Sequence, residues 1–326
     1  MVSAQDLSGV MGMMPAFATP DGADIDATST IDLDNLRDGV NRMIGDGIDV
    51  IATTGSFGEF HTLLWPEFET LARATAEIVN KRVPLFIGTT ALNSREVVQR
   101  MRIAQEVGAY GVLVGVPFYF PSTVDNAVRF YHDIGERFPD LGIMIYHNPA
   151  LHNIMIPVDA FQRITQNRNV VAMKDSHRSP EEFGDLMGIV QGKMTVFVNQ
   201  MQFASYSERG ATACWSIDSW MGPWPLLRLR DAIRAGDLET AKRITTELSG
   251  PQSGDGHGSG GPPNLSWRET ASKIAQQFAG YVNPGPLRPP FVELPTDVVE
   301  SAKKRAAYWN ELCARYRSEV KAPAAV

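Results

Sequence analysis

The chain has 326 residues, 44% hydrophobic and 21% charged, a composition typical of a soluble globular protein. Its net charge of -7 disfavours nucleic acid and anionic membranes as partners, because both attract basic surfaces. The two cysteines, Cys214 and Cys313, exclude a disulfide framework, and no secretory leader or bilayer-length apolar run is visible. We therefore expect a soluble, cytoplasmic protein.

Short apolar segments the size of buried strands alternate with segments of helical periodicity. The strand-like segments lie at 10–19, 48–53, 83–90, 110–117, 142–147, 170–174, 194–199 and 211–217. Parallel strands need crossover helices, and eight such repeats favour closure over an open sheet. The predicted fold class is therefore α/β, a (β/α)8 TIM barrel.

The pattern becomes helical toward the C-terminus. Residues 236–326 predict a C-terminal helical extension, with a break between helices at Gly236. A loop rich in Gly, Pro and Ser spans 250–264. We predict a catalytic barrel domain over 1–235, followed by this extension.

Lys174 ends the sixth strand-like segment, directly after a run of four apolar residues. Lysine resists desolvation, so its side chain either reaches solvent or is held in a pocket for its amine. In a (β/α)8 barrel, catalytic groups lie at the C-terminal ends of the strands. The position therefore makes Lys174 a candidate nucleophile.

The other strand ends supply groups that suit imine chemistry. Tyr146 ends the fifth segment, and the turn "GSFGE" (55–59) follows the second. Apolar surroundings favour the free amine that attacks a ketone, a tyrosine can shuttle protons, and a glycine-rich turn can bind a carboxylate. The six histidines show no metal-ligand spacing, so we expect no metal and no cofactor beyond an imine on Lys174.

The order of these motifs resembles the pyruvate-dependent class I aldolase superfamily that includes dihydrodipicolinate synthase and N-acetylneuraminate lyase. The matching elements, in chain order, are "PAFATP", "GSFGE", "VPFYFP", "YHNP" and "KDS". The resemblance implies that Lys174 forms the Schiff base and that Tyr146 relays protons. It also implies that Gly55, Ser56 and the Phe57 amide bind the pyruvyl carboxylate.

The same resemblance implies a homo-oligomer, a tetramer in which Tyr119 supports the relay tyrosine of another subunit. One departure concerns Leu151, which stands where the synthase branch has a carboxylate-binding arginine. A second is aromatic density around Trp215 and Trp224, where the lyase branch has polar residues for a sugar. Both departures indicate a flat, apolar substituent on the substrate.

The chain therefore most resembles the hydratase-aldolases of aromatic catabolism, including the naphthyl type of phenanthrene degradation. Those enzymes hydrate an aryl-substituted 2-oxobut-3-enoate and cleave it to an aromatic aldehyde and pyruvate. Another pyruvate aldolase, a dihydrodipicolinate synthase-like enzyme and a non-catalytic 2-oxo acid binding barrel are the alternatives.

Several of these residues also have purely structural interpretations. Tyr146 and the two tryptophans could be core aromatics, and the glycine-rich turn could be an ordinary strand–helix connection. Asn264, at the end of the 250–264 loop, is a candidate substrate contact or a solvated loop residue. Strand alternation points His147 away from Tyr146, which favours a core role for that histidine.

Overall fold

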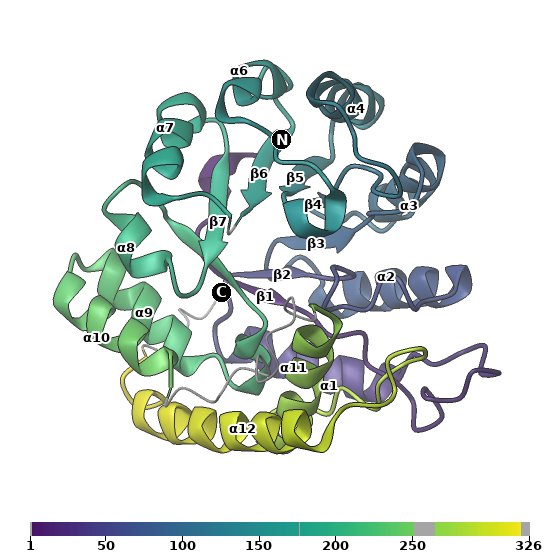
Figure 1. Ribbon diagram of the computed structural model, residues 1–326, viewed down its shortest axis with the longest axis vertical. Coiled ribbons are helices and arrows are strands. Elements are labelled where there is room, and N and C mark those ends of the chain that lie inside the picture. The colour runs from purple at the N-terminus through teal and green to yellow at the C-terminus, as the bar shows by residue number, and fades with distance from the viewer. Residues whose placement is uncertain (1, 176, 251–264, 321–326) are drawn as a thin grey trace. The chain divides into compact units, whose positions relative to one another are not determined.

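The computed structural model describes residues 2–175, 177–250 and 265–320. Its parallel strands form a closed barrel in which consecutive strands are neighbours (Figure 1). The strands are β1 Gly9–Met13, β2 Val50–Ala52, β3 Leu85–Gly88, β4 Gly111–Val114, β5 Gly142–Tyr146, β6 Val170–Lys174, β7 Thr195–Asn199 and β8 Ala213–Ser216. The predicted (β/α)8 barrel with a helical C-terminal part is confirmed.

Each strand lies inside or within one residue of the segment predicted for it, but most are shorter. Residues of β1, β5 and β6 are buried throughout, because parallel barrel strands are covered on both faces. The longest predicted segment, 10–19, becomes strand only up to Met13, after which Ala18 makes an isolated bridge to Ile31.

Several helices begin at residues that cap them with a side-chain hydrogen bond. Asn93 caps α3 by accepting a hydrogen bond from the Glu96 amide, and Ser179 and Glu182 form a capping box at α7. The α-helices are α1 Leu33–Gly45, α2 Trp65–Val79, α3 Ser94–Glu106, α4 Val124–Arg137, α5 Pro149–His152, α6 Phe161–Ile164, α7 Pro180–Val190, α8 Phe203–Ser207, α9 Trp224–Arg234, α10 Leu238–Leu248, α11 Leu265–Ala279 and α12 Thr296–Tyr316. The described residues also form the 3-10 turns η1 Ala4–Asp6, η2 Val158–Ala160 and η3 Asp218–Met221.

The chain divides into two compact units. The first comprises Met1–Met11, Asp49–Thr53 and Asn80–Trp215 and carries most of the barrel strands. The second comprises Gly12–Ile48, Thr54–Val79 and Ser216–Val326. The sequence-based domain boundary after residue 235 remains a prediction.

The second unit has its own core, built around α11 and α12, which pack against each other (Figure 1). Trp309 of α12 is buried and donates a 2.9 Å hydrogen bond to the Gly222 carbonyl. Between α9 and α10, Gly236 takes a positive φ of 72° and Asp237 caps the second helix. The predicted helix break at Gly236 is confirmed.

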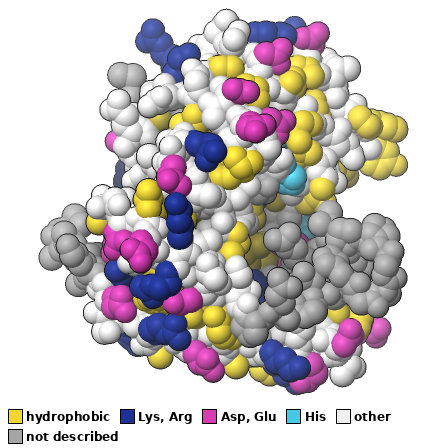
Figure 2. Space-filling view, turned by 60° about the vertical axis from the view of Figure 1, so that its left-hand side comes forward, with side chains coloured by type: hydrophobic (Ala, Val, Ile, Leu, Met, Phe, Trp, Pro, Cys, Tyr) yellow, Lys and Arg dark blue, Asp and Glu magenta, His cyan; other side chains and the backbone are white. Residues whose placement is uncertain are grey.

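Two surface features bear on partners. In the part of the chain that the structure describes, no helix combines the length and the apolar character needed to cross a membrane. On the face drawn in Figure 2, acidic and basic side chains are intermixed.

Candidate active site

Lys174 and Tyr146 lie side by side at the C-terminal ends of adjacent strands. They are register partners in the β5–β6 pairing. Lys174 is 6% exposed and Tyr146 is 4% exposed, and the Lys174 Nζ lies 4.6 Å from the centre of the Tyr146 ring. The lysine therefore does not reach solvent, which removes the structural alternative for this residue.

Trp215 of β8 covers the amine from another side. The Lys174 Nζ lies 3.6 Å from the centre of a Trp215 ring, and the indole N–H donates a 3.1 Å hydrogen bond to the Asp175 carbonyl. Burial disfavours an ammonium ion, whereas the aromatic faces attract a cation. Such surroundings suit a lysine that alternates between a neutral amine and a cationic iminium.

The residues that follow Tyr146 and Lys174 are joined to each other by a hydrogen bond. His147 follows Tyr146, Asp175 follows Lys174, and the His147 Nδ1 lies 2.9 Å from Asp175 Oδ1. Both side chains are nearly inaccessible to solvent. The hydrogen bond therefore links the ends of β5 and β6 on the side away from the amine.

Arg178 completes a closed set of hydrogen bonds, which we call the His147 network: His147, Asp175, Arg178 and the Ile156 backbone. Arg178 donates to Asp175 Oδ2 (2.9 Å) and to the Ile156 carbonyl (2.6 Å), and the Ile156 N–H donates to His147 Nε2 (3.2 Å). Burial alone would raise the pKa of Asp175, but the His147 hydrogen bond and the Arg178 charge hold it well below its usual range.

The hydrogen bonds assign the protons of His147. Because Nε2 accepts from the Ile156 N–H, the neutral ring carries its proton on Nδ1 and donates it to Asp175. Ligand atoms of His147, Asp175 and His177 lie within 4.8 Å of one another, a spacing that a metal could use. Both His147 nitrogens and both Asp175 oxygens are already engaged in hydrogen bonds, so this group fits the network better than a metal site.

A second imidazole packs against Tyr146. His152, at the end of α5, is 3% exposed, and its ring meets the Tyr146 ring edge-on at 4.9 Å. It fits there because Gly115 has no side chain, since a Cβ at that position would lie 2.2 Å from the His152 ring. Burial lowers the pKa of His152 to about 4 despite a hydrogen bond with the Tyr146 backbone, so the ring is neutral at pH 7.

The predicted carboxylate-binding turn follows β2 directly and belongs to the second unit. Ser56 and Phe57 are buried, at 7% and 4% exposure. Gly58 permits the tight path, because a Cβ there would lie 2.7 Å from the Thr54 amide nitrogen. The turn is closed by hydrogen bonds from the Glu59 N–H to the Ser56 carbonyl and from the Phe60 N–H to the Gly55 carbonyl.

The remaining predicted site residues have diverse environments. Tyr119 is 73% exposed and packs edge-on against Phe120, and its place in a subunit interface stays a prediction. Leu151 is half-buried in α5. Trp224, in the second unit, has the Arg317 guanidinium 4.6 Å from its ring centre, and Asn264 lies outside the described residues.

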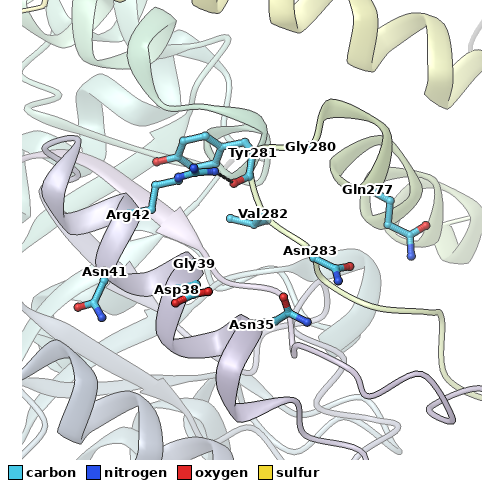
Figure 3. A pocket seen from close by; sticks show the side chains of 10 residues that line it. All are labelled: Asn35, Asp38, Gly39, Asn41, Arg42, Gln277, Gly280, Tyr281, Val282 and Asn283. Atoms are coloured by element: carbon cyan, nitrogen blue, oxygen red, sulfur yellow. Dashed lines mark hydrogen bonds between the residues drawn. The ribbon is translucent and has the colours of Figure 1, made fainter.

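A separate cavity of about 500 Å³ opens beside α1 in the second unit (Figure 3). Arg42 crosses it to donate a 2.5 Å hydrogen bond to the Tyr281 carbonyl. Its lining includes no lysine, cysteine or histidine and no predicted site residue: Asn35, Asp38, Gly39, Asn41, Arg42, Gln277, Gly280, Tyr281, Val282 and Asn283. The described lining offers no amine for imine chemistry, so the strand ends remain the candidate active site.

Sequence reasoning missed the His147 network as a unit and gave no role to Arg178 or Glu59. The proximity of His147 and Asp175 was accessible in principle, because alternation places both on the side opposite Tyr146 and Lys174. No comparable signal identifies Glu59 beyond its place in the "GSFGE" turn.

Known proteins match the chain over most of its length. The sequence pattern of the dihydrodipicolinate synthetase family matches residues 10–251. The trans-O-hydroxybenzylidenepyruvate hydratase-aldolase of Pseudomonas aeruginosa is 30% identical over 98% of this chain and 97% of its own. The trans-2'-carboxybenzalpyruvate hydratase-aldolase of Nocardioides sp. (strain KP7) is 24% identical over 99% and 98%.

Solved structures also match this chain over most of its length. PhdJ bound to a substrate intermediate superposes with a TM-score of 0.91 at 30% identity, covering 96% of this chain and 98% of PhdJ. Dihydrodipicolinate synthase from Aquifex aeolicus, at 21% identity, covers 93% and 98% with a TM-score of 0.81 and shares the fold. The prediction of an enzyme, a lyase of the class I aldolase type, is confirmed, and the chain belongs to the dihydrodipicolinate synthetase family.

Proposed function

We propose that the protein is a Schiff-base-forming hydratase-aldolase acting on an aryl-substituted 2-oxobut-3-enoate, with a hydroxynaphthyl group as the aryl substituent. Its products are an aromatic aldehyde and pyruvate. The observation that carries the proposal is the buried Lys174 amine between the rings of Tyr146 and Trp215. Full-length similarity to named hydratase-aldolases supports it.

The proposed reaction begins with attack of the Lys174 amine on the C2 carbonyl. Tyr146 shuttles the proton that lets the carbinolamine lose water, which leaves a protonated imine. The iminium withdraws electrons from the C3–C4 double bond, so water adds its oxygen to C4, and C3 then takes up a proton. No cofactor is required for this step.

The second half uses the same lysine. Loss of the proton from the C4 hydroxyl breaks the C3–C4 bond, and the bonding electrons move into the iminium to give an enamine. The aromatic aldehyde departs, C3 is protonated, and hydrolysis of the imine releases pyruvate and frees Lys174. The network behind the pair suits this sequence, because it keeps the two strand ends at a fixed separation while charge appears and disappears.

Substrate recognition divides into two parts in this proposal. Gly55, Ser56 and the Phe57 amide bind the carboxylate common to all 2-oxo acids. Trp215, Trp224 and Leu151 contact the aryl group, and Asn264 is a further predicted contact. The apolar Leu151 disfavours a second carboxylate, which supports an aryl substrate over a semialdehyde.

The oligomeric state and location also remain proposals. Tyr119 and Phe120 form an exposed aromatic pair, with 73% and 76% of each residue accessible, which suits burial by a second copy of the chain. We propose a homotetramer that functions in the cytoplasm, without nucleic-acid or membrane partners.

Borohydride trapping tests the chemistry. Incubation with pyruvate and borohydride is expected to add one reduced pyruvyl group at Lys174, located by peptide mass spectrometry. Lys174→Arg keeps the charge but lacks a usable nucleophile, so it is expected to fold, form no adduct and lose turnover. An unmodified wild-type protein, under conditions that trap a control aldolase, would refute the imine mechanism.

Absorbance tests the substrate. Loss of the conjugated absorbance of o-hydroxybenzylidenepyruvate and its naphthyl analogue, with stoichiometric pyruvate release, is expected. Trapping of pyruvate without any change in either chromophore would instead favour a different pyruvate aldolase, the second candidate that the family leaves open.

A further inference from the structure

A buried ion cluster lies at the end of the "GSFGE" turn, within the second unit. The Glu59 Oε2 accepts a 2.6 Å hydrogen bond from the Lys273 Nζ and a 2.7 Å hydrogen bond from Arg288. The side chains of Lys273 and Arg288 are each 2% exposed, and that of Glu59 is 11% exposed. Three charges in so enclosed a position are costly unless each is well paired.

Arg288 uses all five of its N–H groups. Besides Glu59, it donates to the Thr30 hydroxyl (2.8 Å), the Thr30 carbonyl (2.7 Å), the Ala16 carbonyl (2.8 Å) and the Phe17 carbonyl (3.2 Å). A guanidinium offers five donors in a fixed fork, so this geometry fixes its orientation. Arg288 therefore joins the segment that follows β1 to the turn that follows β2.

Glu59 itself has an unusual backbone. Its φ of 54° lies in the left-handed region, which costs a non-glycine residue about 1 kcal/mol or more. Such a conformation persists where the surroundings impose it, and here two cations hold the side chain. Its N–H is bonded to the Ser56 carbonyl, so the position of Glu59 constrains the turn.

We propose that Glu59, held by Lys273 and Arg288, is a positioning residue that sets the geometry of the carboxylate-binding turn, so that the C-terminal part of the chain governs affinity for the 2-oxo acid. This inference rests on the proposed function of the turn. Neither Glu59 nor its two partners touches the reacting atoms in this scheme.

The lowered pKa of Lys273 is consistent with a role in holding Glu59. Burial lowers its pKa to about 8, although Glu59 acts in the opposite sense. Burying a lysine costs more desolvation free energy than burying an apolar residue of similar volume, so Lys273 is not expected to stabilise the fold. The bond that it makes to Glu59 is the gain that offsets the cost.

The test compares two probes of the same lysine. Pyruvate carries the carboxylate that the turn would bind, whereas methyl pyruvate offers the same ketone without a negative charge. The readout is the ratio of the two concentrations that give half-maximal borohydride trapping at Lys174. A merely destabilised protein would lose trapping of both probes equally.

We expect Glu59→Gln and Lys273→Met to lower the preference for pyruvate roughly 10- to 100-fold while methyl pyruvate trapping stays near that of the wild type. Glu247→Gln is the matched control in the same unit, because Glu247 accepts hydrogen bonds from Arg315 and from Tyr316, both at 2.7 Å, away from the turn. It should keep the wild-type ratio.

The outcomes separate the two proposals. Wild-type protein that traps neither probe would refute the imine chemistry itself. Wild-type protein that traps both, together with variants that keep the wild-type ratio, would overturn the positioning role alone. If Glu59→Gln fails to fold, Lys273→Met decides the question, because Arg288 still pairs with Glu59 in that variant.

Discussion

Replacing His147 with leucine would open the His147 network without touching Lys174 or Tyr146. The variant loses the donor to Asp175, a hydrogen bond to a charged group worth about 1.5–3 kcal/mol. It also leaves the buried Ile156 N–H without its acceptor, which costs about 1–3 kcal/mol. Leucine regains part of this through apolar burial, so we expect a net loss of about 3 kcal/mol.

The expected catalytic effect follows from the position of the network. With this side-chain link gone, only the barrel ladder joins the ends of β5 and β6. The separation of the tyrosine and the amine is then less closely fixed, and kcat should fall roughly 10- to 100-fold. The KM should change little, because His147 contacts no predicted substrate group. Urea unfolding and steady-state kinetics on a benzylidenepyruvate measure the two effects separately.

His147→Asn provides the matched control. The asparagine Nδ2–H can replace the Nδ1–H donor to Asp175 but not the acceptor for Ile156, so about half of the stability loss should remain while kcat recovers. A leucine variant with lower stability but wild-type kcat would refute the positioning role. Equal loss of kcat in both variants would show that the bond to Asp175 is not what matters.

Four further outcomes are expected. Burial lowers the pKa of His152 from 6.5 to about 4, so the free energy of unfolding should rise as the pH rises from 4 to 6.5. In urea titrations across this pH range, His152→Gln should reduce that rise by about 3 kcal/mol. Burial lowers the pKa of Lys273 from 10.5 to about 8, so the free energy of unfolding should rise as the pH rises from 8 to 10.5. Lys273→Met should reduce that rise by about 3 kcal/mol. Parallel plots of unfolding free energy against pH for the wild type and the variant would contradict this. Trp215→Leu should reduce borohydride trapping more than Trp215→Phe, because phenylalanine keeps an aromatic face beside the amine. Tyr119→Ala should lower the oligomeric state in sedimentation velocity, and an unchanged state would exclude Tyr119 from the interface.

The adjacency of Lys174 and Tyr146 was accessible from sequence because their placement depends on local patterns. A run of buried apolar residues followed by lysine marks a strand end, and tyrosine marks the end of the preceding strand. In a barrel whose strands follow chain order, consecutive strands are neighbours, so these two ends must adjoin. The register pairing of Tyr146 with Lys174 is the direct consequence.

For His147, the local sequence pattern predicts the direction of the side chain but not its hydrogen-bond partners. Alternation correctly suggested that its side chain turns away from Tyr146, and the structure shows a buried ring. The pattern could not show that Asp175 and Arg178 would complete a closed network there, because that depends on the path of the loop carrying Ile156. Side-chain direction follows from strand period, whereas partners depend on tertiary geometry.

The partners of Glu59 were beyond sequence reasoning for a stronger reason. Lys273 and Arg288 lie 214 and 229 residues further along the chain. No periodic pattern in that part of the sequence indicates that its side chains would reach Glu59. The lysine lies on an ordinary amphipathic helix, and nothing in its neighbourhood distinguishes it from a solvated one. Only the folded chain brings the three charges together.

The two parts of the candidate site are held in place by different kinds of contact. The lysine and tyrosine stand on strands whose backbone is fixed by the barrel ladder and reinforced by the His147 network. The proposed carboxylate-binding turn lies in a loop with a left-handed Glu59, whose side chain is held by two cations distant in sequence. Substitutions behind β5 and β6 should therefore change kcat, whereas substitutions in α11 or near Arg288 should change affinity for the 2-oxo acid. We expect the effects of the two groups of substitutions on transition-state stability to be additive, as they usually are for substitutions in separate networks.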